Sequence, residues 1–382
     1  MKDLTLDSGV LLINKPKDIS SFGVVSRVRK MLGRKKVGHL GTLDPFAVGL
    51  LPIVFGRGTR LTQYLMDHDK VYRVQVVLGI ATDTMDRQGA VVAKSPLSEE
   101  RILELLEHDS QIIRFAVGSL VGVQEQKPPM YSAVKVEGKP LYYYARRGEE
   151  IARASRKIEI YRAELLGVKQ GYSLHSPEDK ILDLDIIIHC SKGTYIRVLA
   201  DELGRRLDSA AHASELERVK VGSLSNEQAI TLTEAESLFY DDCGQDSKRW
   251  VNTVRQLGHV LDLEQAASDF PAQNLDDAQA LKIASGMAIS ASETLAGLVG
   301  RQSRLLGGQP AYIDSADFIQ NESESAFARS TVSNSLQKNI ICLLWRGRLI
   351  ALARLTDDDK FQPETVFVTR EELLRERGNE DS

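Results

Sequence analysis

The chain has 382 residues, 42% hydrophobic and 27% charged, which is ordinary for a globular protein and leaves room for two domains. Its longest near-apolar stretch, residues 45–55, is too short to cross a membrane, and its first residues do not resemble a signal peptide. The three cysteines lie far apart, and the seven histidines lack metal-ligand spacing. We therefore expect a cytoplasmic protein without a disulfide framework or a metal site.

The net charge of −4 hides an asymmetry between the two parts of the chain. Residues 226–382 hold 15 basic and 25 acidic residues, which leaves 34 basic and 28 acidic residues in the first 225. Residues 1–75 alone hold 13 basic and 6 acidic residues. A basic first part is typical of a protein that binds a polyanion, although ordinary solvated surface charge is the alternative.

The first part of the chain alternates strand and helix patterns irregularly. In chain order, the patterns first predict a strand at 10–13, a helix capped by Ser20 or Ser21 and ending at Gly33, and a basic loop at 34–45. A strand at 49–56 and a helix from Thr59 follow. Next come a strand at 71–79, a helix capped by Ser98 and a strand at 181–190. This irregular order favours an α+β fold over a regular parallel sheet.

The last third of the chain has a different character. Residues 280–289 and 339–355 resemble strands of a small β-rich module, and residues 291–338, rich in Ser, Ala, Gly and Gln, resemble a long mobile insertion. We expect the domain boundary after residue 262.

One carboxylate stands out in the segment "GHLGTLDPFAVGLLPIVFGRGTR" at 38–60, because Asp44 is its only acid. The segment lacks the glycine spacing of a phosphate-binding loop or a dinucleotide-binding turn. Pro45 keeps Asp44 out of helical geometry, so the carboxylate can be presented rigidly at the floor of a cleft. The alternative is a turn in which the carboxylate accepts bonds from its own backbone.

Four motifs occur in a specific order: "LLINKP" at 11–16, the segment at 38–60, "KPPMYSAVKVEGKPLYYYARRG" at 127–148 and "HCSKGTYIRVLADELG" at 189–204. Through them, residues 10–225 resemble the TruB family of tRNA pseudouridine synthases. The resemblance implies a catalytic domain with the pseudouridine synthase fold, built on a mixed, largely antiparallel sheet, at 1–262. A small PUA-like RNA-binding domain would follow at 263–382.

The implied activity is that of an isomerase converting uridine 55 in the T arm of tRNA to pseudouridine. The resemblance also implies a monomer that needs no cofactor, metal, membrane or obligatory protein partner. Two alternatives remain open. One is a tRNA chaperone whose catalysis is dispensable, and the other is a synthase acting on a different RNA.

The resemblance implies roles for seven residues. Asp44 matches the essential aspartate, Arg197 the arginine that pairs with it, and Tyr72 the aromatic residue that stacks on the flipped target base. Further positions match residues that contact the substrate or support the aspartate loop: His39, Tyr195, Leu216 and Lys15.

Each of the three main residues also has an ordinary structural explanation. Arg197 could grip the Asp44 carboxylate through two nitrogens, or it could form a surface pair with Asp201, four residues on. Tyr72 could be a core residue of its strand.

Two further segments bear on RNA binding. Residues 124–151 combine basic and tyrosine side chains and resemble the RNA-gripping insertion of bacterial members, with an amphipathic helix as the alternative. Where family members have two adjacent arginines, Glu217 replaces one and Arg218 keeps the other, which puts one phosphate contact in doubt. The stretch "DTMDRQG" at 83–89 lacks the acid spacing of a calcium loop, so we expect a turn there.

Overall fold

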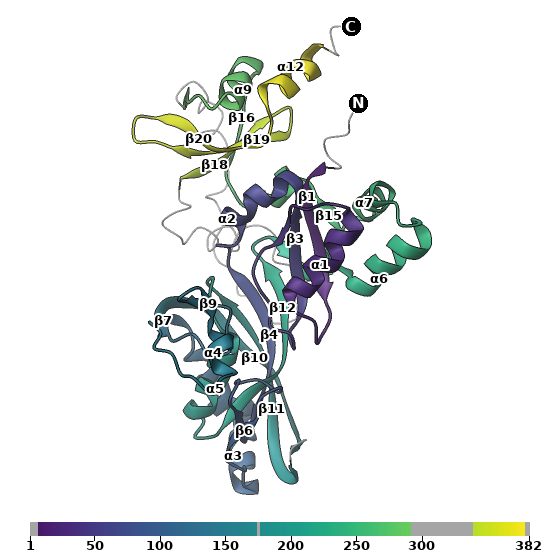
Figure 1. The fold of residues 1–382 in the computed structure, drawn as a ribbon. Coiled ribbons are helices and arrows are strands. Elements are labelled where there is room, and N and C mark those ends of the chain that lie inside the picture. The colour runs from purple at the N-terminus through teal and green to yellow at the C-terminus, as the bar shows by residue number, and fades with distance from the viewer. Residues whose placement is uncertain (1–6, 174–175, 292–338, 379–382) are drawn as a thin grey trace.

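The computed structural model describes residues 7–173, 176–291 and 339–378. Its larger sheet has 11 strands, in the order β14-β1-β3-β12-β4-β11-β10-β7, with β15, β2 and β13 paired to β1, β3 and β12 (Figure 1). The strands are β1 (Gly9–Lys15), β2 (Val37–His39), β3 (Val48–Phe55), β4 (Lys70–Leu78), β7 (Gly122–Gln126), β10 (Arg156–Ser173), β11 (Ser176–Cys190), β12 (Ala211–Val221), β13 (Leu224–Ser225), β14 (Ile230–Thr231) and β15 (Val260–Leu261). Among the described strands of this sheet, only β1–β14 and β3–β12 are parallel pairs, so the predicted mixed, largely antiparallel α+β fold is confirmed.

Two of the predicted helices begin at the predicted serine caps. The Ser20 hydroxyl caps α1 (Ser21–Leu32) by accepting a bond from the Gly23 N–H, and Gly33 ends the helix in the left-handed conformation. Ser98 caps α3 (Glu99–Gly118) in the same way. The helix predicted from Thr59 is a 3₁₀ turn, η2 (Gly56–Leu61), followed by the short α2 (Thr62–Leu65). The remaining helices of the larger unit are α4 (Leu141–Ala145), α5 (Ile196–Arg206), α6 (Leu232–Ser237) and α7 (Ser247–Gln256).

Alternation along β1 divides the core between the two faces of the sheet. Leu11 and Ile13 pack into a cluster with residues of α1, α3, α5 and α7. Val10 and Leu12 point the other way, into a second cluster shared with η2, α2 and the C-terminal module. Because side chains of a strand point alternately to opposite faces, one strand can join both cores.

The C-terminal module forms its own five-stranded sheet at one end of the molecule (Figure 1). Its strands follow the order β16-β18-β19-β20-β17, with bounds β16 (Ala272–Asn274), β17 (Ile289–Ser290), β18 (Ile340–Trp345), β19 (Arg348–Leu355) and β20 (Lys360–Val366). The two strands predicted within 339–355 are confirmed as β18 and β19. Helices α8 (Leu263–Ala266), α9 (Asp277–Ala284) and α12 (Arg370–Gly378) accompany this sheet.

The strand predicted at 280–289 is wrong over most of its length, since residues through Ala284 belong to α9. Asp276 and Gln279 form a capping box at the start of this helix, and Ala280 and Ile283 are buried at helical spacing. Only Ile289 and Ser290 form a strand. The insertion predicted at 291–338 lies, apart from residue 291, outside the described residues.

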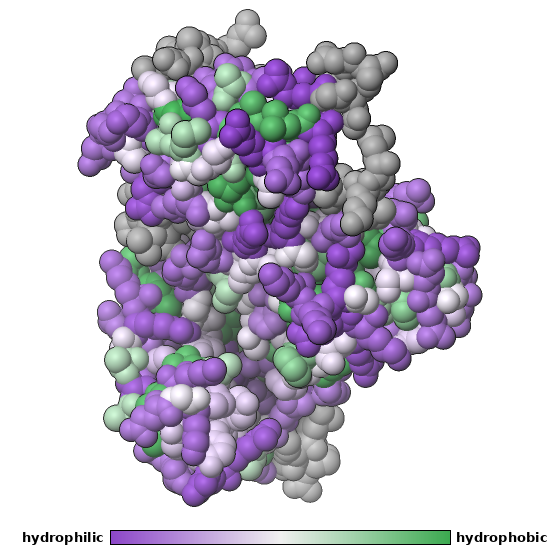
Figure 2. All heavy atoms as spheres, turned by 45° about the horizontal axis from the view of Figure 1, so that its top comes forward, coloured by the Kyte–Doolittle hydropathy of each residue, from purple (hydrophilic) through white to green (hydrophobic). Residues whose placement is uncertain are grey.

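Polar contacts join the module to η2 and α2. Arg57 donates to the Phe367 carbonyl (2.6 Å) and to the Glu372 carboxylate (2.9 Å), and the Tyr64 hydroxyl lies 2.9 Å from that of Thr365. On the face shown in Figure 2, hydrophilic residues predominate and apolar ones form small separate patches. No helix in the described part of the chain has the length and apolarity needed to span a membrane.

Candidate active site

Asp44 lies in the loop between β2 and β3, and this loop is fixed from several sides. Leu43 and Phe46 on either side of it are buried, and the Ser21 hydroxyl bonds both the N–H and the carbonyl of Leu43 (2.8 and 3.1 Å). The turn itself is closed by the Ala47 N–H donating to the main-chain carbonyl of Asp44 (3.1 Å). The loop therefore holds the backbone without using the carboxylate.

The Asp44 carboxylate instead faces Arg197, the second residue of α5. Arg197 Nε lies 2.8 Å from Asp44 Oδ2, and the two side chains are 3% and 30% exposed respectively. The other two nitrogens point elsewhere: Nη1 donates to the Thr84 carbonyl (2.7 Å) and Nη2 to the Tyr131 carbonyl (2.8 Å). The expected pairing is present, but the expected two-nitrogen grip on Asp44 is wrong, because Arg197 distributes its donors over three segments of the chain.

Asp201, the alternative partner of Arg197, pairs with a different arginine. Asp201 pairs with Arg205 on the exposed side of α5, which is the ordinary surface geometry four residues apart. Arg197 itself is buried, so a surface ion pair does not describe it.

A second carboxylate, Asp86, belongs to the same cluster, and no sequence motif indicates it. Its Oδ2 lies 3.2 Å from Arg197 Nη1, and its Oδ1 accepts from the Thr84 hydroxyl (2.7 Å) and the Gln88 N–H (3.0 Å). The turn expected at 83–89 is confirmed. Nothing in a seven-residue turn signals that one of its acids is buried against an arginine more than a hundred residues away.

Burial raises the pKa of the Asp44 carboxyl above its ordinary value, and the neighbouring charge of Asp86 adds to the rise. The positive charges of Arg197 and Lys15 oppose it. A partly buried carboxylate whose pKa is raised and whose cation is fixed is a common feature of catalytic sites.

Lys15 supports the Asp44 loop through hydrogen bonds to main-chain carbonyls. Its fully buried ammonium donates to three carbonyls, those of Pro16 (2.8 Å), Ile19 (2.8 Å) and Pro45 (3.1 Å). Burial lowers the pKa of Lys15 to about 8, with the charge of Asp44 opposing. Since all three donors are used, this geometry favours loop support over a phosphate contact.

Tyr72 and Leu216 come from the adjacent strands β4 and β12 and both lie in the core cluster that also contains Leu43 and Phe46. Burial raises the pKa of the Tyr72 hydroxyl, while the charge of Arg218 and a hydrogen bond from it oppose the rise. The charge of Asp44 contributes to the raised pKa of the Tyr72 hydroxyl.

Tyr195 and His39 are the remaining two predicted site residues. Tyr195 precedes α5; the Gln126 amide binds both its N–H and its carbonyl (2.8 and 3.1 Å), and Arg156 stacks 4.5 Å above its ring. His39 ends β2 and is partly buried; burial and the charge of Arg218 lower the pKa of its imidazole.

Only some of the tyrosine side chains in the segment at 124–151 are exposed. Tyr144 is buried, as the amphipathic alternative requires, whereas Tyr142 is exposed beneath Arg146. Tyr143 lies between Lys139 and Arg147, 4.6 and 5.5 Å from their charges. The segment therefore combines a packed side with an exposed basic and aromatic one.

Arg218, the one of the family's two adjacent arginines that the chain keeps, lies inside the protein. Its side chain is 1% exposed and donates to two main-chain carbonyls inside the protein. A nucleic-acid phosphate cannot reach it in this conformation.

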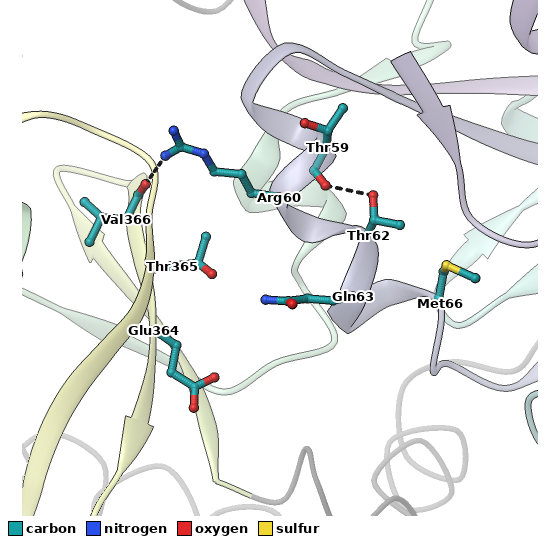
Figure 3. Close-up of a pocket in the computed structure, with 8 residues that line it drawn as sticks. All are labelled: Thr59, Arg60, Thr62, Gln63, Met66, Glu364, Thr365 and Val366. Atoms are coloured by element: carbon teal, nitrogen blue, oxygen red, sulfur yellow. Dashed lines mark hydrogen bonds between the residues drawn. The ribbon is translucent and has the colours of Figure 1, made fainter. Parts of the chain in front are cut away.

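The pocket drawn in Figure 3 lies apart from this cluster, between α2 and β20, and Arg60 reaches across it to the Val366 carbonyl. None of the seven predicted site residues lines it; the residues that do are Thr59, Arg60, Thr62, Gln63, Met66, Glu364, Thr365 and Val366.

Comparisons with known proteins agree with the motifs. Residues 29–196 match the model of the N-terminal domain of the TruB family pseudouridylate synthases. The chain is 40% identical over 291 residues to the "tRNA pseudouridine synthase B" of Aromatoleum aromaticum, covering 76% of this chain and 84% of that protein. It is 39% identical over 262 residues to the protein of the same name from Desulfotalea psychrophila, covering 68% of this chain and all of that one.

A solved structure titled "Crystal Structure of a Cbf5-Nop10-Gar1 Complex" matches the fold. The TM-score is 0.58 at 20% identity, and the match covers 97% of this chain and 88% of that one. At this identity the match supports the fold alone. Taken with the coverage of the two curated relatives, these findings show that the chain belongs to the TruB family of pseudouridylate synthases.

Proposed function

We propose that this chain is an isomerase that converts uridine 55 in the T arm of tRNA to pseudouridine. Membership of the TruB family and the names of the tRNA pseudouridine synthase relatives support tRNA as the substrate. The observation that carries the proposal is the Asp44 carboxylate, held by a buried arginine on a loop that is fixed from several sides.

The reaction breaks the C1′–N1 bond, turns the uracil and joins C1′ to C5, which then loses its proton. We assign Asp44 to the sugar, either as a nucleophile at C1′ or as a base that removes a sugar proton. In either role the carboxylate must be ionised, which Arg197 favours against burial. The atoms of substrate and product are the same, so these steps need no external oxidant, reductant or co-substrate.

We assign Tyr72 to the extruded base. Flipping a base out of a folded loop costs on the order of a few kcal/mol, and stacking on an aromatic ring recovers about 1–3 kcal/mol. Tyr195, Leu216 and His39 would also contact the substrate, and Lys15 would hold the Asp44 loop in place. The exposed basic and tyrosine side chains of 124–151 would grip the RNA.

We further propose that the catalytic unit spans 1–262, that 263–382 is an RNA-binding PUA-like domain, and that a cytoplasmic monomer acts without a protein partner. Light scattering of the purified protein with and without tRNA tests the monomer; a stable dimer in either condition contradicts it.

The activity is tested by tritium release from a T-arm hairpin that contains 5-tritiated uridine. Wild-type protein should release tritium without added metal or cofactor, and Asp44→Asn should release none while still binding the hairpin. Asp201→Asn, which removes a surface partner of Arg205, is the matched control and should behave like wild type. Binding by wild type without release would favour the RNA chaperone, and release from other RNAs alone would favour a different substrate.

A further inference from the structure

Arg218 is a buried cation to which the proposed mechanism assigns no role. It lies on β12 where this strand is paired on both sides, opposite Tyr72 of β4 and Gly49 of β3. Its Nε donates to the Leu50 carbonyl (2.8 Å) and its Nη2 to the Gly41 carbonyl (3.0 Å). Arg218 therefore links three parts of the site. Its guanidinium contacts the strand after the Asp44 loop and the loop itself, and its main chain pairs with the strand of Tyr72.

Two glycines make room for this arrangement. At Gly49, where φ is +95°, an added Cβ would lie 2.5 Å from the Arg218 carbonyl oxygen, so a side chain there would force β12 away from β3. At Gly41, where φ is +104°, an added Cβ would lie 3.3 Å from Arg218 Nη1. Both conformations favour glycine.

The surroundings of Arg218 are unusual for a buried charge. In the described part of the chain its hydrogen bonds go to two main-chain carbonyls and to the Tyr72 hydroxyl, and no ion pair to a carboxylate is present. A buried charge without a counter-ion is costly, so its presence beside a reactive site calls for a functional explanation. Its charge acts on the side chains around the site, including those of Tyr72 and His39.

We propose that Arg218 is a positioning residue, whose guanidinium fixes the Asp44 loop through the Gly41 carbonyl and holds the Tyr72 ring in register with that loop. The proposal rests on the proposed function, because it explains how the carboxylate and the stacking ring keep a fixed separation. Lysine cannot reproduce it, since its donors all sit on one nitrogen, whereas Arg218 presents two separate nitrogens, Nε to the Leu50 carbonyl and Nη2 to the Gly41 carbonyl.

The test compares Arg218→Lys and Arg218→Met with Arg73→Met, a matched control. Arg73 is the neighbour of Tyr72 on β4, but it is exposed and pairs with Asp185 on the surface. Three quantities are measured with the T-arm hairpin: the single-turnover rate, the Kd and the slope of log Kd against log salt. Both Arg218 variants should lose at least about tenfold in single-turnover rate, with Kd changed less than twofold and the salt slope unchanged. Arg73→Met should keep the wild-type rate.

Two outcomes overturn the proposal. A wild-type rate in Arg218→Lys would show that the charge suffices and the fork does not matter. A weaker Kd with an unchanged rate, and a salt slope reduced by about 0.7–0.9, would make Arg218 a phosphate ligand.

Two further measurements keep the proposal testable if the Arg218 variants fail to fold or if the protein lacks the proposed activity. Gly41→Ala crowds the same contact while leaving the charge in place, so a wild-type rate in this variant also contradicts the proposal. Hydrogen exchange of the amides at 40–44 should accelerate in Arg218→Lys while that of β11 does not. This readout needs no catalysis, so it separates failure of the positioning role from failure of the proposed activity.

Discussion

Replacing Arg197 by methionine is the perturbation whose consequences the structure defines best. The variant leaves Asp44 and Asp86 close together without the cation between them, and it removes the donors of the Thr84 and Tyr131 carbonyls. Breaking a buried ion pair by removing one partner costs about 3–5 kcal/mol. If that loss appears in the step that uses Asp44, the rate falls by about 10²- to 10⁴-fold, at about 1.4 kcal/mol per decade.

The same variant should also change the pH dependence. Burial holds the pKa of Asp44 above its ordinary value and Arg197 lowers it, so removing Arg197 raises it further. Activity that needs the ionised carboxylate is lost as the pH falls through the folded pKa, and the acid limb should therefore move to higher pH in the variant. The pKa of Asp44 is higher in the folded protein than in the unfolded chain, where it is about 3.9. The Asp44 carboxyl therefore lowers the free energy of unfolding as the pH rises from the unfolded pKa to the folded pKa.

The assay is single-turnover tritium release from the T-arm hairpin across a pH series, with thermal unfolding measured alongside. Arg205→Met is the matched control, because it removes an exposed arginine of the same helix that pairs with Asp201. It should change stability by less than about 0.5 kcal/mol and leave the rate unchanged. A wild-type rate in Arg197→Met, or an equal loss in both variants, would refute the reasoning.

Four other outcomes follow from the same contacts. Asp86→Asn removes a charge that raises the pKa of Asp44, so the acid limb of its pH–rate profile should move to lower pH, opposite to Arg197→Met. Lys15→Met leaves three partly buried carbonyls without a donor, and its melting temperature should fall by about 2–4 °C for each kcal/mol lost; an unchanged value would exclude loop support. Arg57 holds the pKa of Glu372 down at about 2 from 4.5, so the stability gap between wild type and Glu372→Gln should shrink as the pH falls from 4.5 towards 2, as calorimetry can measure. RNA binding should weaken linearly in log Kd against log salt, and a flat plot would contradict a basic binding surface.

Strands and caps of the larger unit could be predicted because their signals are local. Apolar alternation marks β4 and β11, and a serine before an apolar helical face marks the starts of α1 and α3. The error at 280–289 arose because its apolar residues fit a strand about as well as a helix. The capping box of Asp276 and Gln279, just before the stretch, contained the deciding signal.

The site was less predictable, because its contacts join distant parts of the chain. Family motifs indicated Asp44 and Arg197 as a pair, and the structure brings them together. No pattern indicated that Arg197 would divide its donors among Asp44, Thr84 and Tyr131, or that Asp86 would join them. Such contacts depend on how β5 (Ile80–Thr82), α5 and the 124–151 segment pack together, which no single segment encodes.

The most direct test is to map pseudouridine along an unmodified tRNA after treatment with wild-type protein or Asp44→Asn. The account predicts pseudouridine at position 55 with the wild-type protein and unchanged uridine there with the variant, at matched occupancy of the RNA. Modification at that position by the variant, or none by the wild type, would contradict it.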